Sequence, residues 1–300
     1  MITRVTNQTV MRAAQQNLQH SMSELAKLQD RATSLQKISK PSDDPIGTAD
    51  SMRVRAEQKQ NDQYSRNISD GTGWLTTVDA TLSTATGLMQ KIRDLTVQGA
   101  NDGSMSPEAK EAIAIQLEGL KTELLNSANT KYLGRTIFAG TADTGFAFTD
   151  ATPAPGYAYA GAGTTGTVER QVDASTTVRV DVTGIDVFGE GADSAFALVD
   201  QIVADLRGGT NVGPHLTDLD THLNAILGQH GAVGARHAQI LRAKETNMER
   251  SGSLEAQRSG IEDVDLGEIV LELKLQEVTY QSALAVTARV LQPTLMDFLR

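Results

Sequence analysis

Histidine is the first residue type to test for chemistry, because four of the five histidines recur at intervals of seven or eight residues. They are His215, His222, His230 and His237. A zinc-binding helix presents two histidines four residues apart, and no pair here has that spacing. The chain has no cysteine, which excludes thiolate nucleophiles, thiolate metal ligands and disulfides. The spacing favours histidines that line one helical face over a metal site.

Two other segments contain residue types found in calcium or phosphate sites but lack the spacing that such sites require. Glu262, Asp263 and Asp265 offer carboxylates, but no glycine-containing loop with alternating oxygen ligands surrounds them, as calcium would require. Acids in the first turn of a helix are the better account. The glycine-rich segment 161–166 lacks the strand, helix and lysine of a phosphate loop. We expect no catalytic residue, no cofactor and no metal, and a protein that is not an enzyme.

The elements that position these residues are helices, and the two ends of the chain carry matched apolar heptads. The N-terminal rows are Met11, Leu18, Leu25 and Ala32 with Ala14, Ser21, Leu28 and Leu35. The C-terminal rows are Leu266, Leu273, Tyr280, Thr287 and Thr294 with Val270, Leu284, Leu291 and Phe298. Such a helix cannot bury its apolar row alone, so we expect the first and last helices to pair.

We call ten of these residues the assembly seam: Met11, Leu18, Leu25, Leu28, Leu35, Leu266, Leu273, Tyr280, Leu284 and Leu291. An ordinary bundle whose first and last helices touch would explain the heptads. We favour a helical pair that stays incomplete until neighbouring copies of the chain close around it.

A proline-bounded segment separates the first heptads from the next helix. Pro41 and Pro45 stop the first helix, since the residue before each proline is pushed towards extended backbone. Asp44 can cap a new helix that has Pro45 at its first position. We interpret Pro41, Asp44 and Pro45 as a structural joint.

The middle of the chain changes from helix to strand and back. A long helix is expected from about Pro45 to Gly99, and another begins after Ser106. Segment 132–140 indicates a short hairpin, and segment 141–190 reads as a small β insert, with valines alternating on both sides of a turn near Asp173. Helices resume near Asp193, and Ser259 with Glu262 resembles a capping box that opens the final helix. The fold class is therefore mainly α with an inserted small β domain.

Composition excludes several function classes. The net charge of -10, without a basic stretch, argues against nucleic-acid binding. No apolar run approaches the roughly 18 residues of a membrane span, and the N-terminus lacks a cleavable secretory signal. Taken alone, these features would indicate a cytosolic protein with no membrane contact.

Four motifs resemble the bacterial flagellin family. They are the opening RVTNQ at 4–8, the segment KISKPSDDP at 37–45, Ser65-Arg66-Asn67 with Asp70-Gly71, and RSGIEDVD at 258–265. Each motif is weak alone, but the motifs occur in the family's order and spacing. Together they cover residues 1–140 and 215–300. Within that family, the opening segment, the two prolines and the ending TLMDFL at 294–299 favour the hook–filament junction proteins over the filament subunits.

The resemblance implies an elongated flagellin-like helical bundle with paired N- and C-terminal coiled-coil helices. It implies a terminal layer (1–44 and 260–300), a long-helix core layer (45–140 and 191–259) and an outward-facing β insert (141–190). It also implies secretion through the flagellar type III export route to the extracellular flagellum, which overrides the cytosolic expectation. The implied partners are copies of the chain in a ring, the first hook-associated protein on the hook side, flagellin on the filament side, and an export chaperone. The alternatives are a flagellin and, less favoured, a soluble coiled-coil adaptor.

Overall fold

The computed structural model describes residues 7–101, 105–142, 144–151, 156–161 and 166–291. The chain forms two compact units, which we call the terminal unit (residues 1–60 and 250–300) and the central unit (residues 61–249). The helices in chain order are α1 (Asn7–Ser34), α2 (Pro45–Gly99), α3 (Pro107–Ala128), α4 (Gly184–Phe188), α5 (Ala195–Gly208), α6 (His215–Glu262) and α7 (Leu266–Leu291). The mainly α fold with a small β insert is confirmed, while the three-layer division expected above stays a prediction about an assembly.

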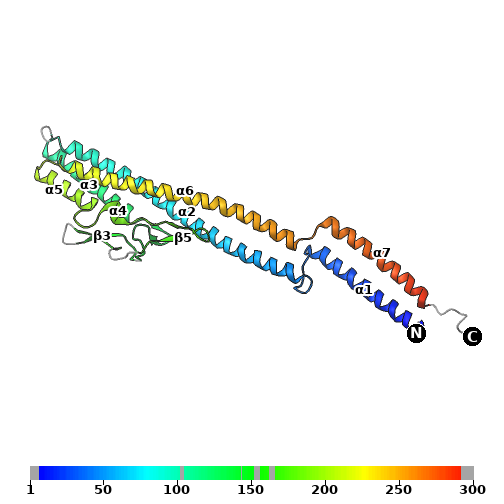
Figure 1. Cartoon of the computed structure of the whole chain (residues 1–300). Helices are drawn as coiled ribbons and strands as arrows, with labels where there is room; N and C mark the ends of the chain where they lie inside the picture. The colour runs from blue at the N-terminus through cyan, green and yellow to red at the C-terminus, as the bar shows by residue number, and fades with distance from the viewer. Residues whose placement is uncertain (1–6, 102–104, 143, 152–155, 162–165, 292–300) are drawn as a thin grey trace, which may run out of the picture. The chain divides into compact units, whose positions relative to one another are not determined.

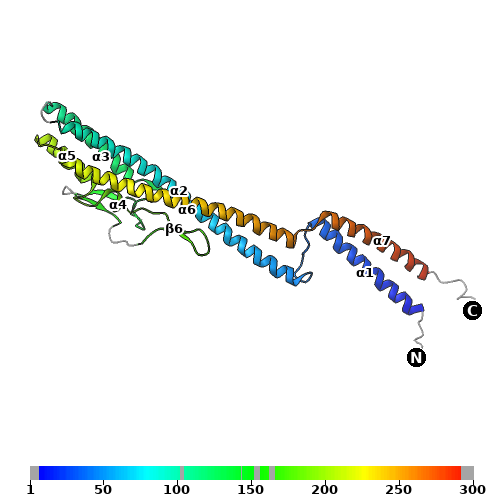
Figure 2. The same ribbon diagram turned by 45° about the horizontal axis from the view of Figure 1, so that its top comes forward.

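The terminal unit contains α1 and α7, the beginning of α2 and the end of α6. Helices α1 and α7 run side by side (Figure 1 and Figure 2). The connection between α1 and α2 pairs with the connection between α6 and α7, since Lys37 N–H donates to the Glu262 carbonyl (2.7 Å) and Val264 N–H donates to the Leu35 carbonyl (3.2 Å). The expected pairing of the first and last helices is therefore confirmed.

Helices α2 and α6 form the spine of the central unit, where they lie side by side (Figure 2). Buried residues recur every seven positions along both helices. The row on α2 is Asn61, Ile68, Leu75, Leu82, Met89 and Thr96, and the row on α6 is Leu219, Ile226, Val233, Ile240 and Asn247. An ion pair between Arg93 and Asp220 (2.6 Å) and a hydrogen bond between His230 and Asp79 (2.9 Å) also cross from one helix to the other. An apolar heptad on each helix explains the pairing.

A pair of buried asparagines interrupts these rows where the central unit begins. Asn61 and Asn247 are 4% and 8% exposed. The Asn61 amide donates to the Asn247 carbonyl (3.2 Å), and the Asn247 amide donates to the Asn61 carbonyl (3.0 Å) and to Asn61 Oδ1 (2.8 Å). Each side-chain amide therefore donates to the other asparagine, and replacing one residue by an apolar one leaves a buried polar group of the other without its bond.

Asn247→Leu alone should lower the free energy of unfolding by about 1–3 kcal/mol, because it removes the side-chain amide that donates to Asn61 Oδ1 and leaves that oxygen buried without this donor. Adding Asn61→Leu should recover most of that loss, since both polar groups are then gone. Urea unfolding of the unaltered chain, the two single variants and the double variant gives the coupling free energy between Asn61 and Asn247. Additive losses would contradict a mutually dependent pair.

The β segments pack onto the helices of the central unit, where β4 contacts α5 and the hairpins that contain β1 and β5 contact α2. The strands pair as β1 (Lys131–Tyr132) with β2 (Arg135–Thr136), β3 (Phe148–Ala151) with β4 (Gly156–Tyr159), and β5 (Glu169–Gln171) with β6 (Thr177–Arg179), all antiparallel. Rings from the insert, α4 and α5 form one cluster, with Phe148 5.3 Å and Phe188 5.5 Å from Phe196. The Tyr157 hydroxyl donates to Asp200 of α5 (2.6 Å). The insert therefore shares the hydrophobic core of the central unit.

Helix ends in the central unit follow the local signals. The Ser106 hydroxyl accepts a hydrogen bond from Ala109 N–H, and Pro107 occupies the first turn of α3. The Ser194 hydroxyl caps α5 in the same way, and Gly209 ends α5 with φ +76°. The expected hairpin at 132–140 is present as β1–β2.

Candidate assembly interface

Helix α1 buries the face that its heptads predict. The half-buried positions include Ala14, Leu18, Ser21, Leu25, Leu28 and Ala32. The two outermost members of the predicted rows differ. Met11 is exposed, and Leu35 is 47% exposed because α1 ends at Ser34 and Leu35 adopts φ +56°. The row that contains Leu35 therefore faces α7 only as far as Leu28.

Helix α7 buries only one of its two predicted rows. Leu273, Tyr280 and Thr287 are buried or half-buried, as the first row predicts. Their companions are Ile269, Gln276 and Ala283, of which Ile269 and Ala283 lie one residue before the predicted Val270 and Leu284. Leu266, Val270 and Leu284 are exposed. Leu291 is the last residue of α7, and its side chain lies outside the described part of the structure.

Val270 and Leu284 do not face α1, because α7 is apolar around much of its circumference; their place in an assembly seam stays a prediction. Ile269 is 3% exposed, whereas Val270, its neighbour in sequence, is 54% exposed. Both residues satisfy a heptad template, so apolarity cannot choose between them. The contact is also partly polar, since Gln276 Nε2 donates to the Ser21 carbonyl (3.1 Å).

A second apolar row remains on the outside of α7. Leu271, Leu275, Val278 and Val286 are each 60–64% exposed. Their spacing of four, three and eight residues places them along one face, opposite the face that contacts α1. An exposed apolar row of this length is typical of a protein–protein contact surface.

The joint has the cap that the sequence indicates. Asp44 Oδ1 accepts a hydrogen bond from Gly47 N–H (2.9 Å), and α2 begins at Pro45. Asp43 accepts from the Ser39 hydroxyl and Lys40 N–H, each at 3.0 Å, which lowers the pKa of the Asp43 carboxyl. Pro41 is exposed in this turn. That the segment works as a joint between layers stays a prediction.

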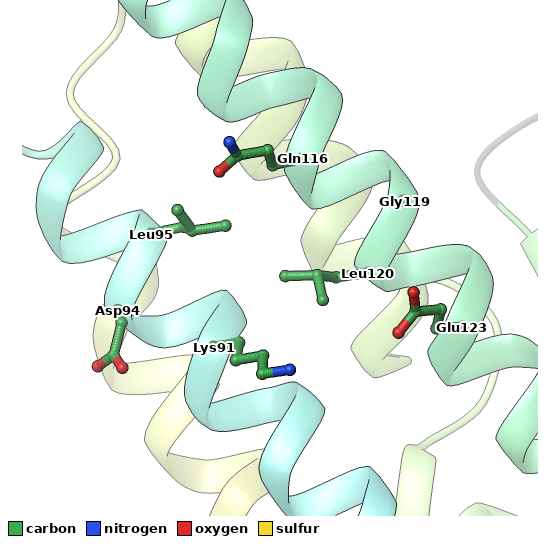
Figure 3. Close-up of a pocket in the computed structure, with 7 residues that line it drawn as sticks. All are labelled: Lys91, Asp94, Leu95, Gln116, Gly119, Leu120 and Glu123. Carbon is green, nitrogen blue, oxygen red and sulfur yellow. The ribbon is translucent and has the colours of Figure 1, made fainter.

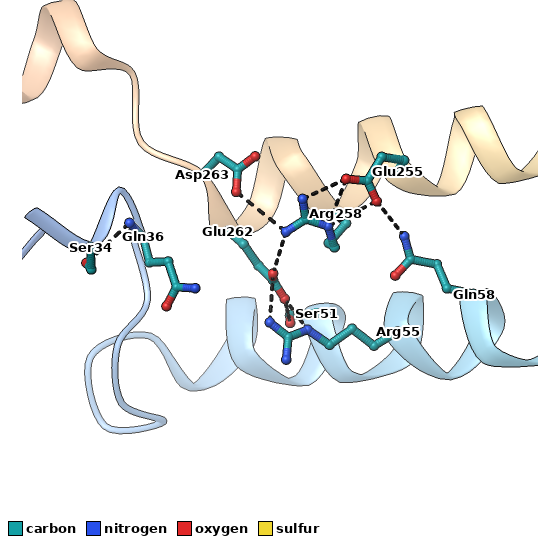
Figure 4. Close-up of polar contacts among 9 residues, drawn as sticks. All are labelled: Ser34, Gln36, Ser51, Arg55, Gln58, Glu255, Arg258, Glu262 and Asp263. Atoms are coloured by element: carbon teal, nitrogen blue, oxygen red, sulfur yellow. Dashed lines mark hydrogen bonds and ion pairs between the residues drawn. The ribbon is translucent and has the colours of Figure 1, made fainter. Parts of the chain in front are cut away.

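Glu262 is the centre of a polar cluster beside this turn (Figure 4). Its carboxylate accepts hydrogen bonds from Arg55 Nε (2.6 Å) and Nη2 (2.8 Å), from Arg258 Nη1 (3.0 Å), and from the Ser51 hydroxyl. Arg258 also pairs with Glu255, which accepts from Gln58 Nε2 (2.9 Å). The bidentate contact with Arg55, aided by Ser51 and Arg258, lowers the pKa of Glu262 to about 2 although burial opposes that shift.

The expected capping box at Ser259 and Glu262 is therefore wrong. Glu262 is the last residue of α6, and α7 begins at Leu266, where Asp265 Oδ1 accepts from Gly267 N–H (2.7 Å). A carboxylate at a helix C-terminus is disfavoured by the helix dipole. The two guanidinium groups offset that cost, and no local sequence signal identifies Arg55 as a partner more than 200 residues away.

The histidines act as isolated polar partners. His215 Nε2 lies 2.7 Å from Asp205, and His230 Nε2 lies 2.9 Å from Asp79. Burial lowers the pKa of His222. Among the described residues, no three histidine or acidic side chains are grouped so that they could hold a metal ion. Within the same part of the chain, no helix is long and apolar enough to cross a membrane.

Comparisons with known proteins point to one family. Residues 5–143 match the model of the bacterial flagellin N-terminal helical region. Flagellar hook-associated protein 3 of Salmonella typhimurium is 25% identical over 306 aligned positions, which cover 93% of this chain and 94% of that protein.

Two solved structures share the fold. A Vibrio parahaemolyticus protein described as flagellar hook-associated matches with a TM-score of 0.67 at 20% identity, over 74% of this chain and all of that one. The flagellar junction protein FlgL of Legionella pneumophila matches with a TM-score of 0.59 at 16% identity, over 71% of this chain and 100% of that one. With matched terminal helices, a β insert between long helices and this set of relatives, the chain is similar to the bacterial flagellin family.

Proposed function

We propose that this chain is a structural subunit of the bacterial flagellum that joins the hook to the filament. The match to a hook-associated protein, which covers both chains almost end to end, supports this role. Copies of the chain would form a ring, with the first hook-associated protein on one side and flagellin on the other. The chain would reach this position by type III export, escorted by an export chaperone.

One observation carries the proposal. Helix α7 packs against α1 with one face. Its opposite face leaves four apolar side chains exposed: Leu271, Leu275, Val278 and Val286. Burying a leucine side chain in a contact with another copy contributes about 1.5–3 kcal/mol before the cost of association. The terminal helices of one chain therefore have a surface for a second copy while they remain paired with each other.

Deleting the gene tests the role directly. Cells without this protein should assemble hooks but release flagellin into the medium, since filament subunits would have no platform. Expression of the unaltered chain should restore filaments, and expression of the Leu275→Asp variant should not. Filaments of normal length in the deletion strain would contradict the proposal.

Flagellin is the alternative, because the matched family model is itself a flagellin model. Copy number separates the two roles. A junction subunit should be a minor component of purified flagella, whereas a filament subunit should be the major one.

A further inference from the structure

The β1–β2 hairpin exposes an apolar side chain in an unfavourable backbone conformation. The loop between Tyr132 and Arg135 has two residues, Leu133 with φ +48° and Gly134 with φ +83°. Such loops favour asparagine followed by glycine, because both residues need positive φ. A leucine there is a conformational outlier. Leu133 is also 79% exposed, so nothing within the described chain compensates for it.

The hairpin holds Leu133 in a fixed place. Tyr132 packs edge-on against Trp74 of α2, with ring centroids 5.8 Å apart, and the Arg135 guanidinium lies over the Trp74 ring at 5.8 Å. Ile137 N–H donates to the Thr130 carbonyl (3.1 Å) and closes the base of the hairpin. Two cationic residues flank the loop in sequence, Lys131 two positions before Leu133 and Arg135 two positions after it.

The central unit also has a groove between α2 and α3, whose lining is both apolar and acidic and so complements an apolar side chain flanked by cations (Figure 3). The groove measures about 440 Å³, and its apolar surface comes from Leu95 and Leu120, which point towards each other across it. Gly119 lines it on α3, where an added Cβ would meet no atom within 4 Å. Among the charged lining residues, the carboxylates of Asp94 and Glu123 outnumber the single ammonium of Lys91.

The hairpin cannot reach the groove of its own chain. It is fixed at Trp74, whereas Leu95 lies 21 residues further along the same helix, roughly 30 Å at 1.5 Å per residue. We propose that Leu133 of one copy inserts into the α2–α3 groove of a second copy, with its flanking cations beside Asp94 and Glu123. The hairpin and the groove are different surfaces, so the contact is heterologous and repeats from copy to copy, as in a ring or helical array. The inference rests on the proposed self-assembly and names one contact within it.

Two substitutions should remove this contact without unfolding the chain. Leu133→Asn suits the positive φ, and Gly119→Leu fills the groove with a good helix former, so each variant should melt at or above the temperature of the unaltered chain. Each should weaken self-association of the full chain roughly tenfold, as expected for loss of a central apolar anchor. A mixture of the two variants should form pairs but no longer arrays, because one intact hairpin and one intact groove remain.

Disulfide trapping tests the contact itself, since the chain has no cysteine of its own. Leu133→Cys and Gly119→Cys chains, mixed at a concentration where the full chain sediments as oligomers, should form a heterodimeric disulfide under oxidation. Leu133→Cys mixed with Leu227→Cys, an exposed position on α6, should cross-link at least several-fold less. Oligomers without the 133–119 disulfide would overturn the hairpin–groove contact and leave the proposed function standing. A full chain that stays monomeric at every concentration would overturn both.

Discussion

Ile269→Asp should separate α1 from α7 and abolish assembly, the largest effect that a single substitution in the terminal unit is expected to have. Ile269 is 3% exposed, and an unpaired carboxylate at such a site costs several kcal/mol. Amide exchange should then show loss of protection along α1 from Ala14 to Ala32. The central unit should keep its melting transition, because its core lies in residues 61–249.

The matched control lies on the opposite face of the same helix. Leu275 is 62% exposed, so Leu275→Asp should leave α1 protected from exchange yet still prevent assembly. Loss of α1 protection in both variants would show that the two faces of α7 are not separable. Leu284→Asp should resemble Leu275→Asp more than Ile269→Asp, since Leu284 is exposed as well.

Glu262→Gln should lower the free energy of unfolding of the terminal unit by about 2 kcal/mol at neutral pH, because it removes the charge that Arg55 and Arg258 bind. The exposed Glu24–Lys27 pair supplies the control. Glu24→Gln should change stability by less than about 1 kcal/mol, as is typical of surface ion pairs.

The effect of Glu262 should depend on pH in one direction. Its folded pKa of about 2 lies below the ordinary value of 4.5, so the folded state favours the ionised form. The stabilisation is complete above pH 4.5 and disappears progressively as the pH falls towards 2. Urea unfolding should therefore show the unaltered chain and Glu262→Gln converging over that range. A constant difference down to pH 2 would contradict the ion-pair account.

Local sequence patterns were sufficient to predict most of the helices and the β segments. The heptads of α1, the proline at the start of α2, the serine at the start of α3 and the glycines at the end of α5 all act within a few residues. Their effects depend on backbone geometry and on side chains one turn away. The starts of α2 and α3, the end of α5 and the β insert could therefore be predicted from the chain without knowing what each element packs against, whereas the boundary between α6 and α7 could not.

Two features of the site needed the tertiary structure. Val270 and Ile269 are equally apolar, and only the packing of α1 against α7 decides that Ile269 is buried. Glu262 has the sequence context of a helix start, yet it is the last residue of α6. Its partner Arg55, which is distant in sequence, binds its carboxylate there. Burial and ion pairing are set by the partner surface, which a one-dimensional pattern does not contain.

The sequence by itself thus determined the element types, their order and the family resemblance, because periodicity, helix caps and short motifs are local properties. The tertiary structure alone decided which apolar rows are satisfied within one chain and which are left for another copy. The exposed row of α7 and Leu133 look the same in sequence as buried residues. Only their positions relative to α1 and Trp74 show that they remain uncovered.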